Sequence, residues 1–253
     1  MSETQANGIS TSFQKVGSGP TLVLLHGWAN TWESWLPIVP MLSDHYELIM
    51  PDLPGCGKTQ TPPTGWTTKE SAVWFEDFLS HAVDRTKPLL LAGHSYGGKI
   101  LIYHQTHKTR FVAQKIILID SSGIPNKLND RQQILQLFGL LTPKFLKRTL
   151  PRVREQLYKT LGSDSDYIHA THFQASTLKL ILKEDFTQDL ANIQAPTLLI
   201  WGKDDPATPL WQGEAMHNLI PLNDFHVLPG RHFPHHEYSE KVAKLILEFL
   251  QQP

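Results

Sequence analysis

The stretch LLLAGHSYGGKILIYH, residues 89–104, decides the fold. Its first half is a short apolar run and its second half has helical composition, so it predicts a buried strand that turns directly into a helix. The turn carries Gly93-His94-Ser95-Tyr96-Gly97, a G-x-S-x-G pattern that places a serine on a sharp, strained bend. Bulk at residue 93 or 97 would clash with the neighbouring strand or helix. The stretch therefore predicts an exposed nucleophilic serine, Ser95.

The rest of the chain repeats this alternation of strand and helix. Further apolar runs, each ending at Gly, Pro or Asp, lie at 21–27, 46–52, 115–120, 196–202 and 224–230. Helical patterns fall at 32–42, 68–84, 96–108, 209–219 and 238–251. Such alternation predicts an α/β fold with a mostly parallel, doubly wound sheet. Residues 9–20 alternate weakly around Gly17 and Gly19, which predicts an added antiparallel hairpin at the edge.

The alternation breaks between residues 124 and 192, where the composition is helical and no strand is evident. We expect a helical cap inserted into a core formed by 1–123 and 193–253. The cap is basic: between 131 and 159 its charged residues are Arg131, Lys144, Lys147, Arg148, Arg152, Arg154 and Lys159, against Glu155. Two interpretations stay open. The charges form a solvated face, or some arginines lie at the cleft and favour an anionic substrate.

The stretch PDLPGCGKT, residues 51–59, ends like a nucleotide-binding P-loop. The first glycine of that motif would fall at Asp52, whose carboxylate would repel phosphate, and Pro54 removes a backbone donor. Pro62 and Pro63 also prevent the helix that should follow. The stretch instead predicts a sharp Gly/Pro-rich turn after a strand, with Cys56 as a small loop residue.

A serine hydroxyl needs a base, and the base needs an orienting acid. Asp205 follows the apolar run 196–202, and His232 follows the run 224–230. Each lies where a parallel strand would end, so both should reach the edge of the sheet that carries Ser95. Asp204 and Asp120 are alternative acids. His235 and His236, the alternatives to His232, are interpreted as loop or surface residues.

These motifs together resemble the α/β-hydrolase superfamily over nearly the whole chain. His26-Gly27-Trp28 resembles its oxyanion segment, GHSYGG its nucleophile elbow, WGKDDPATP its acid loop and GRHFPHHE its histidine loop. PDLPGCGKT is similar to the turn after another core strand of that family.

The resemblance implies roles for individual residues. Ser95 would be the nucleophile, His232 the general base and acid, and Asp205 the orienting carboxylate. The backbone amides of Trp28 and Tyr96 would form the oxyanion hole. Gly27, His94 and Trp28 would be the substrate-binding residues, with His94 packed beside the site. The resemblance implies no cofactor, and no metal is expected.

The expected function follows from a serine at the elbow, which disfavours the family branches that use aspartate there, such as haloalkane dehalogenases and most epoxide hydrolases. We expect hydrolysis of small to medium carboxylic esters through an acyl-enzyme. The alternatives are a C–C bond hydrolase for meta-cleavage products, a hydrolase of thioesters or carrier-linked esters, and, from a different class, a non-catalytic ligand receptor.

Length, charge and cysteine count limit the classes of partner and the location that we expect for this protein. The chain has 253 residues, is 40% hydrophobic, has a formal net charge of −1 and contains one cysteine. We therefore expect one soluble domain with an insertion, with neither nucleic acid nor a membrane as partner. The polar N-terminal segment and the single cysteine favour a cytoplasmic location. We expect a monomer or weak homodimer that acts on a small molecule.

Overall fold

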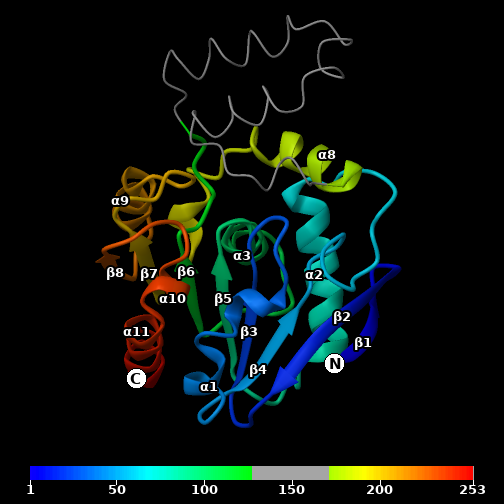
Figure 1. The fold of residues 1–253 in the computed structure, drawn as a ribbon, viewed down its shortest axis with the longest axis horizontal. Coiled ribbons are helices and arrows are strands. Elements are labelled where there is room, and N and C mark those ends of the chain that lie inside the picture. Colours follow the sequence, from blue (N-terminus) through cyan, green and yellow to red (C-terminus); the bar gives the residue numbers. More distant parts are fainter. Residues whose placement is uncertain (127–170, 253) are drawn as a thin grey trace, which may run out of the picture.

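The computed structural model describes residues 1–126 and 171–252. Figure 1 shows an eight-stranded sheet in the order β1-β2-β4-β3-β5-β6-β7-β8. The strands are β1 (Ser2–Ala6), β2 (Ile9–Val16), β3 (Thr21–Leu25), β4 (Glu47–Pro51), β5 (Leu89–His94), β6 (Lys115–Ile119), β7 (Thr197–Gly202) and β8 (Asn223–Leu228). Strands β3 to β8 are mutually parallel, whereas β1 and β2 are antiparallel to their neighbours.

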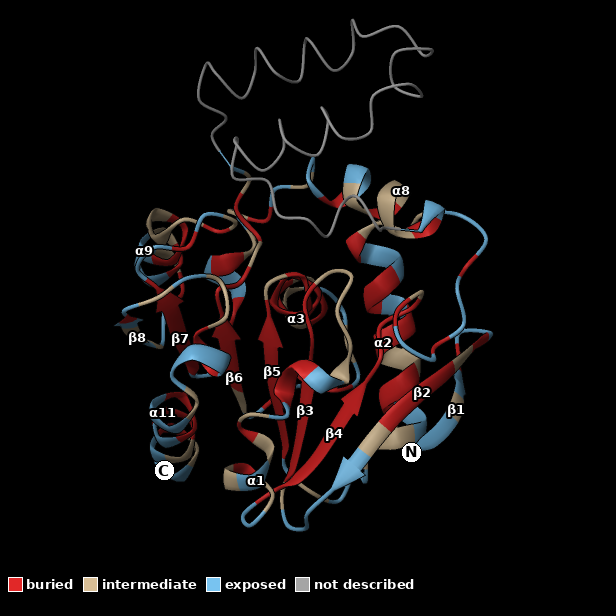
Figure 2. Ribbon diagram, in the orientation of Figure 1, coloured by how far each residue is buried: buried red, intermediate tan, exposed pale blue. Residues whose placement is uncertain are grey.

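The central strands are buried on both faces, as their continuous apolar runs predict. Leu22 and Leu24 of β3 belong to one hydrophobic core, whereas Val23 and Leu25 belong to the core on the opposite face. This alternation follows from the two-residue period of a strand. In Figure 2, buried residues fill the strands at the centre of the sheet.

Helices cover both faces of this sheet. The elements are η1 (Trp32–Trp35), α1 (Val39–Leu42), α2 (Thr68–Ala82), α3 (Tyr96–Thr106), α8 (His172–Ile181), η2 (Leu190–Asn192), α9 (Leu210–Leu219), α10 (Pro234–Glu237) and α11 (Ser239–Gln251). One core receives side chains from α2, α3 and α9, such as Phe75, Ile100 and Met216. The other receives side chains from η1, α1 and α11, such as Trp35 and Ile246.

Two local predictions are wrong in detail. The helix expected at 32–42 is a short 3-10 segment followed by the short α1, because Pro37 lies between them and proline cannot continue a helix. The edge hairpin exists, but its turn is Asn7-Gly8, with φ of 49° and 73°. Asn-Gly with positive φ at both positions suits a tight hairpin turn. Gly17 and Gly19 instead lie in the connection from β2 to β3.

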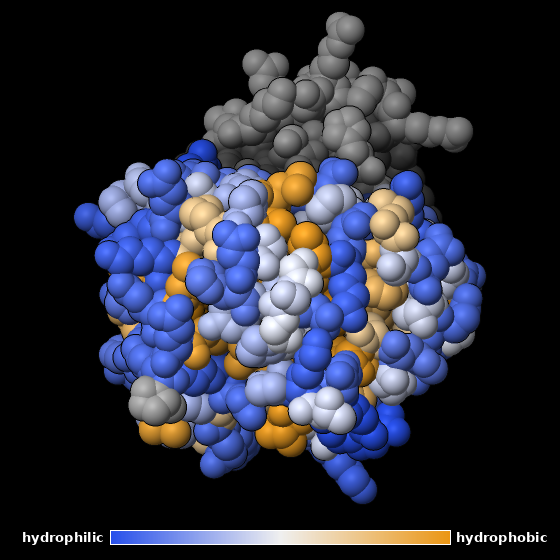
Figure 3. Space-filling model, turned by 90° about the horizontal axis from the view of Figure 1, so that it is seen from below, coloured by the Kyte–Doolittle hydropathy of each residue, from blue (hydrophilic) through white to orange (hydrophobic). Residues whose placement is uncertain are grey.

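The segment 127–170 lies outside the described residues, and with it the basic stretch 131–159 and most of the expected cap. The described part of the cap includes α8, which lies beyond the carboxyl ends of the parallel strands (Figure 1). Figure 3 views the molecule from below; this face is mostly hydrophilic, with apolar residues in small separate areas. Within the described residues, no helix combines the length and apolar character that a membrane span requires.

Candidate active site

Ser95 lies between β5 and α3 in a conformation that few residues other than glycine adopt. Its backbone has φ 51° and ψ −115°. Its amide donates to Ile119 O at 3.0 Å, and its carbonyl accepts from both the amide and the hydroxyl of Ser122, at 3.1 and 3.2 Å. These bonds fix the strained turn to the end of β6. Ser122 supports the serine in a way that the sequence did not reveal, since the contact forms between two strand ends.

Gly93 and Gly97 leave room for this turn. A Cβ on Gly93 would lie 2.5 Å from the amide nitrogen of Gly98, and a Cβ on Gly97 would lie 2.2 Å from Leu25 O. Both neighbours are backbone atoms that cannot rotate away. The prediction that bulk at either position would clash with helix or strand is confirmed.

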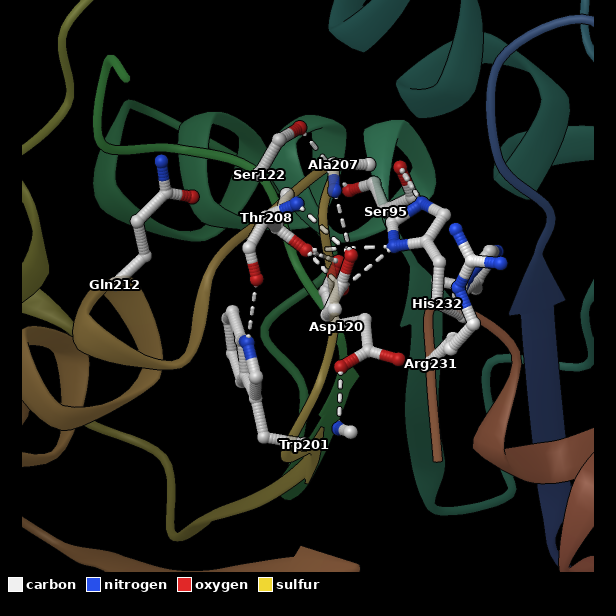
Figure 4. Close-up of polar contacts among 12 residues, drawn as sticks. Ser95, Asp120, Ser122, Trp201, Ala207, Thr208, Gln212, Arg231 and His232 are labelled. Carbon is white, nitrogen blue, oxygen red and sulfur yellow. Dashed lines mark hydrogen bonds and ion pairs between the residues drawn. The ribbon is translucent and has the colours of Figure 1, made fainter. Parts of the chain in front are cut away.

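The structure brings Ser95, His232 and Asp205 together. Figure 4 shows the side chains of Ser95 and His232 next to each other. His232 Nε2 lies 3.1 Å from Ser95 Oγ, and His232 Nδ1 lies 2.7 Å from Asp205 Oδ2. Since a carboxylate only accepts, His232 must donate through Nδ1–H, which leaves Nε2 free to accept the serine proton. The arrangement can deprotonate Ser95 as it attacks a carbonyl carbon.

Asp205 is held in place by four donors. Its Oδ1 accepts from the amides of Ala207 and Thr208, at 2.7 and 3.1 Å. Its Oδ2 accepts from Thr208 Oγ1 as well as from His232, both at 2.7 Å. Asp205 is buried and these bonds stabilise its charge. Sequence reasoning missed Thr208 as a candidate site residue, although its place three residues after Asp205 was a usable signal.

The alternative acids lie differently. Asp204 is exposed. Asp120 is fully buried at the end of β6 with φ 41°, and its Oδ1 accepts from the Gly202 amide at 2.7 Å. Burial, then the nearby Asp205 carboxylate, raise the pKa of Asp120 well above its usual value. The neutral form of Asp120 is thus favoured over its charged form.

Two buried histidines pack behind His232. His94 is 1% exposed, and its Nε2–H donates to the backbone carbonyl of His232 at 2.7 Å. His94 was expected to be a substrate-binding residue packed beside the site. This contact instead favours a role in positioning the loop that carries His232. His235, interpreted as a loop or surface residue, is fully buried, with its ring 4.9 Å from that of Trp35. That interpretation is wrong because α10 turns His235 inward.

His26, Gly27 and Trp28 lie beside the elbow. His26 is neutral: burial lowers its pKa to about 4, its Nδ1–H donates to Gly27 O and its Nε2 accepts from the Leu53 amide, at 2.8 and 2.9 Å. A Cβ on Gly27 would lie 3.2 Å from Ser95 Cβ, so this segment passes close to the serine. Tyr96 is the first residue of α3. Its backbone amide has no acceptor within the helix and lies at the positive end of the helix dipole.

The turn that resembles a P-loop folds around Asp52. The carboxylate of Asp52 accepts from the amides of Trp32 and Lys58, at 2.9 and 3.0 Å. Thr59 Oγ1 donates to the Asp52 carbonyl at 2.8 Å. The acidic side chain thus accepts from the Lys58 amide, within the stretch that resembles a P-loop. Burial raises the pKa of Cys56 to about 11, so it is no thiolate nucleophile at neutral pH.

A pocket opens next to the elbow, between the oxyanion segment and α8. Its cavity volume is about 20 Å³. Its lining residues are Trp28, Ala29, Leu53, Pro54, Cys56, Trp66, Ser71, Tyr96, Ile100, Phe173, Gln174 and Thr177. None of these described lining residues carries a charge at neutral pH. Trp28 lies in the pocket as expected, and its Nε1 donates to Gln174 O at 3.2 Å.

His94, Asp120 and His232 offer atoms that lie within 4.8 Å of one another, the spacing of a possible metal site. Both nitrogens of His232 are already directed to Asp205 and Ser95, and Nε2 of His94 to a backbone carbonyl. A metal would have to replace the contacts that align Ser95 and His232. The geometry suits acid–base chemistry better than metal binding.

The chain shares sequence and fold with known hydrolases. A 2-hydroxy-6-oxo-2,4-heptadienoate hydrolase of Pseudomonas putida is 26% identical, covering 97% of this chain and 94% of that protein. A pimeloyl-(acyl-carrier protein) methyl ester esterase of Legionella pneumophila is 27% identical, covering 94% and 98%. The structure of a thermophilic esterase from Thermogutta terrifontis, 24% identical, superposes with a TM-score of 0.77 over 99% of this chain and 98% of the other, which shows a common fold.

Residues 22–245 match the profile described as the Alpha/beta hydrolase family. The matched range contains Ser95, Asp205 and His232, and the sheet order and the strained serine turn fit the same family. The protein is therefore a hydrolase that belongs to the alpha/beta hydrolase family.

Proposed function

We propose that the protein is a serine hydrolase that cleaves small to medium carboxylic esters through an acyl-enzyme. The observation that carries this proposal is the hydrogen-bonded row Ser95–His232–Asp205, with separations of 3.1 and 2.7 Å. The row supplies a nucleophile, a base and an orienting carboxylate in one line. The strained backbone of Ser95 directs its hydroxyl away from the sheet, where a carbonyl carbon can approach.

The reaction runs in two halves. Ser95 Oγ attacks the ester carbonyl as His232 Nε2 takes its proton, and the oxyanion is stabilised by the amides of Trp28 and Tyr96. One such donor contributes about 3–4 kcal/mol to transition-state stability. The intermediate collapses, the alcohol leaves with the proton from His232, and the acyl group stays on Ser95. Water, deprotonated by His232, then releases the carboxylic acid and restores Ser95.

The pocket supports a neutral acyl group. Its described lining is apolar and aromatic, with hydroxyl and amide groups from Ser71, Tyr96, Gln174 and Thr177. Burying an unpaired carboxylate there would be costly. A linear or small branched acyl chain fits this chemistry better than an anionic one.

Two alternative functions are each supported by one relative. The similarity to a heptadienoate hydrolase supports C–C bond cleavage, which passes through an oxyanion in the same place. The similarity to a carrier-protein ester esterase supports a carrier-linked ester, or an acyl thioester. The described pocket lining favours the ester over the anionic dienoate. A non-catalytic receptor is the least supported candidate, because a receptor needs no aligned nucleophile and base.

The test is turnover of p-nitrophenyl esters from acetate to palmitate by wild type, Ser95→Ala and Cys56→Ser. We expect wild type and Cys56→Ser to hydrolyse esters at similar rates, and Ser95→Ala to lose more than about 10⁴-fold in kcat. Cys56 is the matched control because its side chain is also of a nucleophile type and lines the pocket next to Ser95. An active Ser95→Ala protein would contradict the mechanism. An inert wild type that cleaves a dienoate would establish the C–C candidate instead.

We further propose that the protein acts in the cytoplasm, as a monomer or weak homodimer, on a small molecule. The composition supports this, with one cysteine and nearly balanced charge. Sedimentation at several protein concentrations measures the oligomeric state.

A further inference from the structure

Lys99 is a buried lysine one helical turn after the serine. It lies in α3, is 4% exposed, and its amide donates to the Ser95 carbonyl at 3.2 Å. A lysine is almost never this buried unless it is paired. Its Nζ donates to the carbonyl of Ile181, the last residue of α8, and to Glu184 O at 3.3 Å, and lies 3.6 Å from Glu184 Oε2. The ammonium thus binds the carboxyl end of α8, where a positive charge is favoured.

Glu184, the partner of Lys99, caps a second helix. Its Oε1 accepts from the amide of Thr68, the first residue of α2, at 3.0 Å, and its Oε2 accepts from the Thr68 hydroxyl at 2.5 Å. A carboxylate at the amino end of a helix complements the helix dipole. The pair therefore joins the end of α8, the start of α2 and the first turn of α3.

These three helices form the walls of the pocket. Phe173, Gln174 and Thr177 of α8 line it on one side, and Tyr96 and Ile100 of α3 on another. A second bond, from the Trp66 amide to Thr177 Oγ1 at 3.0 Å, holds the middle of α8 to the same loop that leads into α2. The position of α8 relative to Ser95 then depends on the pair at its end.

We propose that Lys99 and Glu184 are positioning residues for substrate binding: the pair fixes α8 over the pocket and thereby sets the length of acyl chain that the site accepts. The proposal rests on the proposed ester hydrolysis for its substrate class. Neither residue touches the reacting atoms. The pair acts on the pocket wall, so its loss should change the affinity for the acyl chain more than the chemical step.

A second lysine offers a matched control. Lys115 also binds the carboxyl end of a helix, since its Nζ donates to Phe249 O of α11 at 2.9 Å. Each lysine also lies 5.2 Å from the centre of a phenylalanine ring, Phe186 for Lys99 and Phe249 for Lys115. Lys115 is the first residue of β6. It therefore lies at the amino ends of the parallel strands, away from the pocket at their carboxyl ends.

The variants are Lys99→Met, Glu184→Gln, the double variant and Lys115→Met. Glu184→Gln leaves the buried Lys99 without its countercharge, and Lys99→Met leaves the partly buried Glu184 without its own. The double variant leaves neither charge, so it keeps the test valid if the single variants fold poorly. We expect the KM for p-nitrophenyl octanoate to rise about tenfold or more in Lys99→Met and the double variant, with kcat within about threefold of wild type. The KM for acetate should change less, and Lys115→Met should keep the chain-length profile of wild type.

Two readouts need no turnover. Hydrogen exchange of the α8 amides should be faster in Lys99→Met than in wild type, while Lys115→Met affects only α11. The dissociation constants of linear methyl ketones, measured by calorimetry, should lose their dependence on chain length in Lys99→Met and the double variant. An unchanged chain-length profile in the double variant, by either KM or ketone binding, would overturn the proposal. A wild type that binds the ketones but hydrolyses no ester would contradict the proposed function alone, because the ketone result still decides the role of Lys99.

Discussion

The hydroxyl of Thr208 donates to Asp205 Oδ2 at 2.7 Å, the same oxygen that accepts from His232 Nδ1. Thr208 Oγ1 also lies 3.0 Å from the carbonyl of Asp120. A hydroxyl has one proton, and a hydrogen bond to a charged acceptor is the stronger of the two. Thr208 therefore directs its proton to Asp205 and fixes the oxygen that accepts from His232 Nδ1.

Removing the hydroxyl of Thr208 should weaken catalysis. Thr208→Val keeps the size of the side chain but takes one donor from a buried carboxylate. A hydrogen bond to a charged group is worth about 1.5–3 kcal/mol, so kcat/KM should fall by about tenfold or more. Thr208→Ser, which retains the hydroxyl, should stay near wild type. Steady-state kinetics on one ester measures both, and equal rates for the two variants would contradict this role of Thr208.

The two buried acids should respond differently to amidation. In Asp205→Asn the one amide oxygen should take the place of Oδ1, which accepts from two backbone amides, and the NH2 group then faces His232 in place of Oδ2. The Nδ1–H form of His232 loses its acceptor, so kcat should fall by about 10⁴-fold. Asp120→Asn should keep kcat within about tenfold of wild type, because burial and the Asp205 carboxylate favour the neutral form of Asp120, and an asparagine oxygen can still accept from the Gly202 amide. Turnover of both variants on the same ester decides between the acids. A greater loss for Asp120→Asn would show that Asp120 orients the base.

Much of the fold and the central row of the site could be predicted from sequence because both follow from local patterns. Apolar runs that end at Gly, Pro or Asp marked the strands, and strand ends converge at one edge of a parallel sheet. Ser95, Asp205 and His232 each follow such a run directly. Their proximity is therefore a consequence of topology, which the alternation of elements already indicated.

The remaining features depend on contacts between distant segments. Lys99 and Glu184 are 85 positions apart in the sequence, and no local sequence pattern around either residue predicts that they pair. His235 was interpreted as a loop or surface residue from its place three residues after His232, but α10 packs it against Trp35. The helix expected at 32–42 was a local error, since Pro37 was visible in the sequence.

A smaller side chain at Phe173 should lengthen the preferred acyl chain. Its ring is 6% exposed, lines the pocket, contacts Trp66 edge to face at 6.2 Å and covers Gly55, where a Cβ would lie 2.3 Å from it. Phe173→Leu should shift the p-nitrophenyl ester optimum to longer chains and destabilise the protein by roughly 1–3 kcal/mol. Phe111→Leu, a buried ring beside Arg85 and outside this pocket, controls for the loss of stability. A shift in both variants, or in neither, would contradict the role of Phe173.

Stability should fall as the pH drops below the ordinary histidine range, because the four buried histidines of the described residues all have lowered pKa values: His26, His94, His104 and His235. Burial lowers the pKa of His26 to about 4 and the pKa values of His94 and His235 well below 6.5. Below about pH 6.5 the unfolded chain therefore binds protons that the folded protein does not, and each histidine lowers the free energy of unfolding by up to about 1.4 kcal/mol per pH unit. Asp120 acts in the opposite direction, because its raised pKa means that the folded protein holds this proton more tightly than the unfolded chain does. As the pH falls it therefore raises the free energy of unfolding, but as one group against several histidines.

The contribution of one histidine can be isolated with His235→Phe. Both ring nitrogens of His235 lack a hydrogen-bond partner among the described residues, so phenylalanine should be tolerated against Trp35. Urea unfolding between about pH 7.5 and 5 should show a slope that is smaller than in wild type by up to about 1.4 kcal/mol per pH unit. His45→Phe, a change at an exposed position, should keep the wild-type slope. Parallel curves for wild type and His235→Phe would mean that His235 takes up its proton without unfolding, and that its burial does not hold it neutral.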